Sequence, residues 1–180
     1  MNDSQEPELQ PEEFKTPLPP EGDNIASRDK RFFAAMIDGF LGMLVSIPLF
    51  NFYGVWDSVQ SNTPLPGSVS TTLTIFGLVM FFVLHGYLLF QYGQTIGKRL
   101  MGIAIVTMDG NKPNFWPLIA NRYLPQWVAG LIPAIGPLLA IADVSYIFFN
   151  DQKRCVHDLI AGTKVIDLRI RTQGYARMEV

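Results

Sequence analysis

Residues 32–53, FFAAMIDGFLGMLVSIPLFNFY, form an apolar run that contains one carboxylate, Asp38. As a helix that rises about 1.5 Å per residue, the run covers roughly 33 Å, which is enough to cross the hydrocarbon core of a bilayer. An ionised carboxylate costs about 2.5 to 3.5 kcal/mol near the centre of a membrane helix. The stretch therefore predicts a membrane-spanning helix in which Asp38 has a partner or a function.

The basic residues of the 180-residue chain fall into three groups, within residues 15–31, 98–122 and 153–177, and long apolar runs separate the groups. No Lys or Arg occurs between Phe32 and Gly97, although the formal net charge is only −2. This segregation is typical of a multi-pass membrane protein, and it argues against a nucleic-acid partner because each basic group adjoins an apolar segment. The single cysteine excludes an intramolecular disulfide.

A second apolar run, residues 71–92, has the length of another span. Residues 115–150 are too many for one span and barely enough for two. Two spans, 115–132 and 134–150, keep the last basic group on the same side as the first two, as the positive-inside tendency requires. Pro133, Gly136 and Pro137 supply the turn between them. Three spans, or a re-entrant hairpin with the same orientation of the termini, remain open alternatives.

Two segments outside the predicted spans, in the second cytoplasmic loop and in the C-terminal part, alternate like strands: MGIAIVTMDG, residues 101–110, and TKVIDLRI, residues 163–170. We expect them to pair beneath the helices. The predicted fold is an all-α transmembrane helical bundle of about four spans, the third and fourth short, with a small cytoplasmic β-hairpin-like element.

The chain divides into three parts by composition. Residues 1–27 are expected to be a disordered, acidic, Pro-rich cytoplasmic tail, because they contain too little apolar surface to fold. Residues 28–168 form the transmembrane domain, and residues 169–180 form a cytoplasmic C-terminal tail.

Four ionisable residues lie at a similar distance from the cytoplasmic ends of the predicted spans: Asp38, His85, Arg122 and Asp143. At helical rise, each lies roughly 10 Å below the same surface. Charged groups inside a bundle usually face its interior and pair, so Arg122 is expected to contact one or both aspartates. This polar layer has three interpretations: a structural cluster that only locks the register of the helices, an ion or proton pathway, or a site for a lipid headgroup or a partner.

The segments RDKRFFAAMID, GQTIGKRLMGIAIVTMDG and VHDLIAGTKVI together resemble the RDD family of bacterial membrane proteins. Arg31 and Asp38 match the Arg and the first Asp of the family name. Asp143 is the preferred match for the second Asp, and Asp158 is its rival. The resemblance implies a multi-pass protein of the bacterial cytoplasmic (inner) membrane, for which transport, including Na⁺/H⁺ antiport by some members, has been proposed.

Two functions follow as hypotheses. One is a small, oligomeric exchanger of monovalent cations and protons that works through the polar layer. The other is a non-transporting membrane module that binds a protein partner or anionic lipid through its cytoplasmic loops, with Lys98 and Arg99 near the headgroups. We expect no enzymatic activity, no cofactor and no metal site, because no nucleophile set, nucleotide fingerprint or Cys/His cluster stands out.

Overall fold

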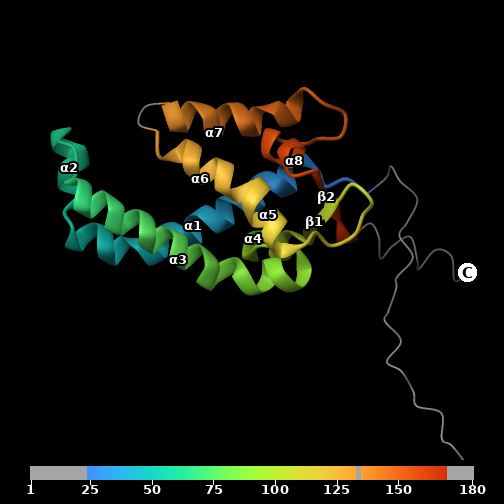
Figure 1. Ribbon diagram of the computed structural model, residues 1–180, viewed down its shortest axis with the longest axis horizontal. Coiled ribbons are helices and arrows are strands. Elements are labelled where there is room, and N and C mark those ends of the chain that lie inside the picture. Colours follow the sequence, from blue (N-terminus) through green and yellow to red (C-terminus); the bar gives the residue numbers. More distant parts are fainter. Residues whose placement is uncertain (1–23, 133–134, 170–180) are drawn as a thin grey trace, which may run out of the picture.

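The computed structural model describes residues 24–132 and 135–169, and most of these residues are helical (Figure 1). Two long helices, α1 (Arg28–Phe52) and α3 (Gly67–Tyr92), lie side by side. The short helix α2 (Val55–Ser61) lies between them in the chain, at the end of the pair that is far from the sheet.

The helices α1 and α3 are long and apolar enough to cross a membrane, and very few of their residues are buried inside the protein. A core helix of a soluble protein would be mostly buried, whereas these helices expose large apolar side chains such as Phe40 and Val83. The predictions for residues 32–53 and 71–92 are therefore confirmed as helices of membrane-spanning length. Each begins four residues earlier than expected, and Pro48 is accommodated inside α1.

Residues 115–148 form a helical hairpin of two short arms. The first arm is continuous and consists of α5 (Phe115–Leu118), the π-helical turn η1 (Ile119–Tyr123) and α6 (Leu124–Gly130). The second consists of α7 (Ile135–Ser145) and the 3₁₀ turn η2 (Tyr146–Phe148). The arms are about 24 and 21 Å long, less than the roughly 30 Å of a hydrocarbon core. The prediction of four spans is thus supported for two of them.

The hairpin arms pack closely where α6 meets the start of α7 (Figure 1). A side chain at Gly136 would lie 2.7 Å from the carbonyl oxygen of Ala129, so the contact needs glycine. Pro133 lies outside the described residues. Pro137 was expected to lie in the turn between the two arms, but it lies in the first turn of α7. Proline removes no helical hydrogen bond at this position, so it does not interrupt the helix.

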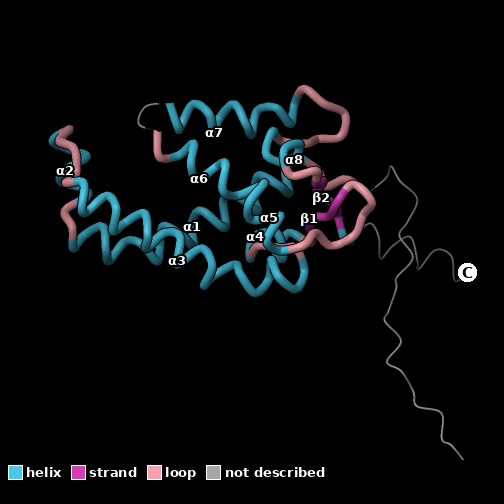
Figure 2. Tube along the Cα trace, in the orientation of Figure 1, coloured by secondary structure: helices cyan, strands magenta, loops and turns pink. Residues whose placement is uncertain are grey.

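The two strand-like segments pair as predicted. Strand β1 (Ile103–Thr107) is antiparallel to β2 (Thr163–Asp167), with Ile103 opposite Asp167 (Figure 2). The pair is not a hairpin, because the helical hairpin of residues 115–148 and helix α8 (Val156–Ile160) lie between the strands in the chain. The sheet therefore joins the two halves of the sequence.

The end of the predicted N-terminal tail belongs to the fold. Ile25 forms a β-bridge with Ile166. The backbone amide of Ala26 donates to the carbonyl of Val165 at 3.0 Å, and the backbone amide of Asp167 donates to the carbonyl of Asn24 at 2.7 Å. Residues 1–23 and 170–180, on which the rest of the two tail predictions falls, lie outside the described residues.

The buried core lies at the sheet end of the long helices. Its apolar residues come from the start of α1, the end of α3, both strands and the first hairpin arm: Ala26, Ala34, Leu89, Ile103, Ile105, Leu118, Ile119, Tyr123 and Val165. Helix α4 (Ile96–Met101) crosses α1 so closely here that a side chain at Gly97 would overlap the carbonyl group of Ala34. This crossing positions α4 against Asp38.

Candidate functional site

Asp38 binds the beginning of α4. Its carboxylate accepts a hydrogen bond from the Thr95 hydroxyl at 2.5 Å and another from the Gly97 amide at 2.7 Å. The Thr95 hydroxyl also accepts from the Lys98 amide at 3.3 Å and caps the helix. Asp38 is therefore a carboxylate from α1 that satisfies one of the free amides at the beginning of α4.

His85, from α3, lies beside this carboxylate. Its Nδ1 accepts a hydrogen bond from the Ile96 amide at 3.3 Å and lies 3.8 Å from Oδ1 of Asp38. The ring is buried and packs edge-on against Phe81. Because Nδ1 is an acceptor, the neutral ring carries its proton on Nε2.

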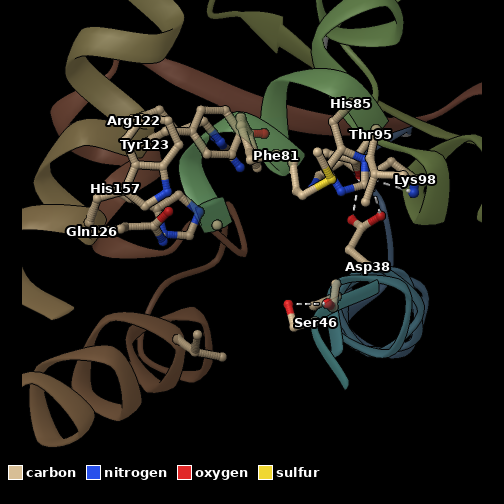
Figure 3. Close-up of a pocket in the computed structure, with 17 residues that line it drawn as sticks. Asp38, Ser46, Phe81, His85, Thr95, Lys98, Arg122, Tyr123, Gln126 and His157 are labelled. Carbon is tan, nitrogen blue, oxygen red and sulfur yellow. Dashed lines mark hydrogen bonds and ion pairs between the residues drawn. The ribbon is translucent and has the colours of Figure 1, made fainter. Parts of the chain in front are cut away.

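A cavity of about 500 Å³ opens beside this pair (Figure 3). Polar side chains reach it from α1, α3, α4, the first hairpin arm and α8; they are Asp38, Ser46, His85, Thr95, Lys98, Arg122, Tyr123, Gln126 and His157. The Tyr123 hydroxyl is buried and makes no hydrogen bond within the described residues. The cavity therefore combines acidic, basic and neutral polar groups at the sheet end of the long helices.

Asp158, from α8, is fully buried and lies between two arginines. Arg31 donates to its Oδ2 at 3.0 Å, and Arg122 donates to its Oδ1. Arg122 also donates to the Thr163 hydroxyl at 2.7 Å. Arg122 lies in the π-helical turn η1, and such turns are frequent at functional sites. This cluster connects α1, the first hairpin arm, α8 and β2.

The pKa of Asp158 lies well below its usual range. Burial alone would raise it, but the guanidinium groups of Arg122 and, to a smaller extent, Arg31 stabilise the charged form. The Cys155 amide also donates to the carboxylate, at 3.1 Å, which closes the first turn of α8. Asp158 therefore caps α8 and also has an ionic role.

Asp143 makes a separate cluster between α7 and α8. Its carboxylate accepts from the His157 amide at 2.8 Å and contacts the His157 ring nitrogen Nδ1 at 2.6 Å. The Gln126 amide donates to it at 3.0 Å. Burial lowers the pKa of His157, which favours the neutral ring despite the neighbouring carboxylate.

The structure brings the four residues of the predicted polar layer near one another but not into one cluster. Asp38, His85 and Arg122 line the same cavity. Asp143 lines a neighbouring one of about 390 Å³, and Gln126 and His157 border both cavities. The expectation that Arg122 pairs with Asp38 or Asp143 is not met, because the more deeply buried Asp158 occupies its guanidinium group.

Three residues of these clusters were not predicted as part of the polar layer: Asp158, Thr95 and Gln126. Asp158 appeared only as the rival to Asp143 for the second Asp of the family signature. In the structure Arg31 pairs with Asp158, whereas Asp143 binds His157 and Gln126. The sequence signal was the HDLIAGT segment itself, in which an Asp shortly before a Gly turn and a strand is placed to cap α8.

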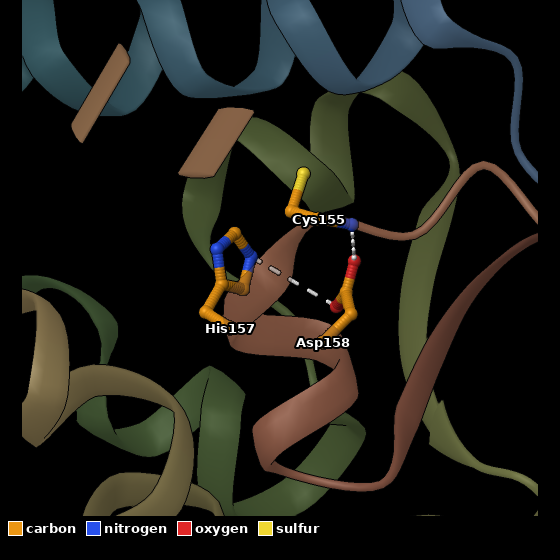
Figure 4. A group of neighbouring side chains, drawn as sticks. All are labelled: Cys155, His157 and Asp158. Carbon is orange, nitrogen blue, oxygen red and sulfur yellow. Dashed lines mark hydrogen bonds and ion pairs between the residues drawn. The ribbon is translucent and has the colours of Figure 1, made fainter. Parts of the chain in front are cut away.

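Three neighbouring side chains at the beginning of α8 have the chemistry of metal ligands: Cys155, His157 and Asp158 (Figure 4). Their possible ligand atoms lie within 4.8 Å of one another. The group does not fit a metal well. The Asp158 oxygens already bind two guanidinium groups, and a dication would add charge to the same place. Burial raises the pKa of Cys155 to about 11, so the thiolate that would bind a metal is disfavoured.

Lys98 and Arg99 are adjacent in sequence but lie in different environments. Arg99 is exposed, and its guanidinium group lies over the ring of Tyr92, 4.8 Å from the centroid. Lys98 is partly buried and borders the cavity of Asp38. The two residues predicted to contact headgroups therefore differ in what they can bind.

The two apolar helices are long enough to cross a membrane, and together with the short helical hairpin and the buried ionic cluster they are typical of a small helical membrane protein. The chain belongs to the RDD family, whose model matches residues 25–162. The resemblance that the sequence motifs indicated is thus confirmed.

Two curated relatives match most of the chain. The uncharacterized protein YckC of Bacillus subtilis (strain 168) is 32% identical over 136 residues, which cover 75% of this chain and 80% of YckC. An uncharacterized protein of Haemophilus influenzae (strain ATCC 51907 / DSM 11121 / KW20 / Rd) is 25% identical over 157 residues, which cover 86% of this chain and 85% of the relative. No solved structure matches.

Proposed function

We propose that this protein is a non-enzymatic membrane transporter that exchanges protons for a small monovalent cation at Asp38 and His85. The observation that carries the proposal is the position of this pair: a carboxylate and an imidazole from the two long apolar helices, 3.8 Å apart, beside a cavity of about 500 Å³. Intramembrane ionisable groups that border a cavity commonly mark ion and proton pathways.

The hydrogen bonds of the pair offer a way to couple proton binding to movement. A proton added at Nδ1 of His85 removes the acceptor of the Ile96 amide and turns a new N–H toward Asp38. Asp38 at the same time holds the Thr95 hydroxyl and the Gly97 amide. Protonation would therefore redistribute the bonds that hold the beginning of α4, and the Asp38 carboxylate would alternate between proton and cation.

The proposed topology places both termini on the cytoplasmic side of the bacterial inner membrane. The helices α1 and α3 cross the bilayer, and the hairpin of residues 115–148 enters and returns, either as two short spans or as a re-entrant element. The absence of Lys and Arg from residues 32–97 supports an external loop around α2. The exposed apolar faces of α1 and α3 leave room for a second copy, which alternating access with so few helices would require.

Reconstituted proteoliposomes with a trapped pH-sensitive dye test the proposal. Gradients of Na⁺, K⁺ and Li⁺ should drive proton flux in the wild type, and Asp38→Asn should abolish it. Asp57→Asn is the matched control, because Asp57 is an exposed acid in α2, away from the cavity. Intact flux in Asp38→Asn would overturn the proposal.

Folding must be monitored alongside flux, because Asp38 also caps α4. Asp38→Glu keeps the charge and should retain part of the flux, whereas His85→Asn removes the proton acceptor and should reduce it. Size-exclusion profiles and thermal unfolding of each variant separate a misfolded protein from an inactive one.

The second candidate is a non-transporting module that binds anionic lipid or a protein partner at its cytoplasmic face. Two exposed cations that lie over aromatic rings at the end of α3 favour it. Arg99 lies over Tyr92, and Lys112 lies over Phe90, 5.6 Å from the ring centroid. This candidate predicts no cation-driven flux in the wild-type proteoliposomes.

A further inference from the structure

A third cavity, of about 200 Å³, lies between the beginning of α1, α4 and η2. Four cationic side chains line it: Arg28, Arg31, Lys98 and Arg122. Among the described residues, no carboxylate lines it. A space of this size can hold several water molecules or one phosphate group, since a water occupies about 30 Å³ in the liquid.

The cations of this cavity are only partly neutralised. Asp158 is shared between Arg31 and Arg122, so one carboxylate serves two guanidinium groups. The Arg31 side chain is only 9% exposed, and its Nε atom is buried without a hydrogen-bond partner in the described part of the protein. A buried donor without an acceptor is costly, and a bound anion would supply the acceptor.

Lys98 adds a charge that no carboxylate contacts directly. Within the described residues, its ammonium group has neither a hydrogen bond nor an ion pair. Burial, followed by repulsion from Arg122, lowers the pKa of Lys98 to about 8, while Asp38 and Asp158 only partly offset these effects. An anion in the cavity would relieve this repulsion.

The rim of the cavity is apolar and faces outward. Phe32, at the start of α1, is 60% exposed, and Phe148, in η2, is 67% exposed. The guanidinium group of Arg28 lies over the Phe148 ring, 5.4 Å from its centroid. Cationic and aromatic groups side by side at the end of a membrane helix suit the boundary between headgroups and acyl chains.

We propose that this cavity binds the phosphate of an anionic phospholipid, with Arg28, Arg31, Lys98 and Arg122 around the headgroup and Phe32 and Phe148 against the acyl chains. Excess positive charge disfavours zwitterionic lipids, whose headgroups carry an ammonium group into the same space. The apolar rim favours a lipid over a free phosphate ion, which gains nothing from exposed phenylalanines. This site shares Lys98 and Arg122 with the cavity beside the Asp38–His85 pair, but lipid binding at it does not depend on transport.

Native mass spectrometry of the full-length protein in a neutral detergent tests the proposal with phosphatidylglycerol as the probe. The wild type should retain one phosphatidylglycerol molecule in preference to phosphatidylcholine. Lys98→Gln and Arg28→Gln should each weaken its retention by about fivefold, because each removes a charge from the cavity. Arg28 lies at the start of α1, so its variant remains informative if Lys98→Gln does not fold.

Lys164→Gln is the matched control, because it removes the same charge from a residue of β2 that does not line the cavity. It should leave phosphatidylglycerol retention near the wild-type level. Equal losses in Lys98→Gln and Lys164→Gln would show only general surface attraction and would overturn the site. Inorganic phosphate that competes as strongly as the lipid would also overturn the lipid assignment.

Discussion

Arg31, at the start of α1, donates a hydrogen bond of 3.0 Å to the fully buried carboxylate of Asp158, which lies 127 residues later in α8. Arg122 binds the other oxygen of the same carboxylate. The three residues come from the beginning, the middle and the end of the domain. A single buried carboxylate therefore holds the beginning of α1 to the hairpin and the sheet.

Neutralising Asp158 should destabilise the protein far more than neutralising Asp143. Asp158→Asn leaves two buried guanidinium groups without a counter-charge, a change that typically costs about 3 to 5 kcal/mol. The Asp143 side chain is 15% exposed and has a histidine and a glutamine as partners, so Asp143→Asn should cost less. Thermal unfolding in detergent micelles measures both. Equal destabilisation would contradict the central role of Asp158.

Gly97→Ala should disrupt the contact between α1 and α4. The new methyl group would overlap the carbonyl of Ala34, a backbone atom that cannot move aside without shifting a helix. We expect a loss of about 1 to 3 kcal/mol in the free energy of unfolding, as for other overpacked sites.

Gly39→Ala, in α1, is the control for this substitution, because nothing lies within 4 Å of a side chain there. It should be neutral or slightly stabilising, since alanine favours helix over glycine. Unfolding curves that are alike for the two variants would show that the α1–α4 crossing tolerates a methyl group.

Cys155 should react slowly with thiol reagents in the folded protein. Burial raises its pKa to about 11 from an ordinary value near 9, so the reactive thiolate is roughly 100-fold rarer at pH 8 than in the unfolded chain. Because this is the single cysteine, labelling with a maleimide reports on it alone. Labelling should accelerate as the pH rises toward 11 and on unfolding, and fast labelling of folded protein at pH 7 would contradict the prediction.

Phosphatidylglycerol binding should weaken as the pH rises through about 8. The Lys98 ammonium loses its proton in this range because its pKa is lowered, and the cavity then loses one positive charge. The groups that influence Lys98 from the other elements are Arg31, Asp38, Arg122 and Asp158, and the two arginines stay charged there. Lys98→Arg should remove this pH dependence while retaining the lipid. If lipid binding by Lys98→Arg still weakened as the pH rises through about 8, the pH dependence would belong to another group and the prediction would be wrong.

The sequence by itself determined the parts that depend on local composition. Apolar runs of sufficient length specify α1 and α3, because a helix must satisfy its own backbone hydrogen bonds in lipid. Alternating β-branched residues specify the two strands, and the motifs around Arg31, Gly97 and Asp158 were sufficient to indicate the family.

Only the tertiary structure decided which charges pair. Counting residues from the ends of helices placed Asp38, His85, Arg122 and Asp143 at one depth, but depth does not specify the direction in which a side chain points. The π-helical turn at Arg122 changes the helical phase, and α8 folds back beneath the hairpin and brings Asp158 to Arg122 and Arg31. Asp38 binds the beginning of α4 because Gly97 allows the two helices to touch. These pairings depend on backbone crossings between distant segments, which no local pattern encodes.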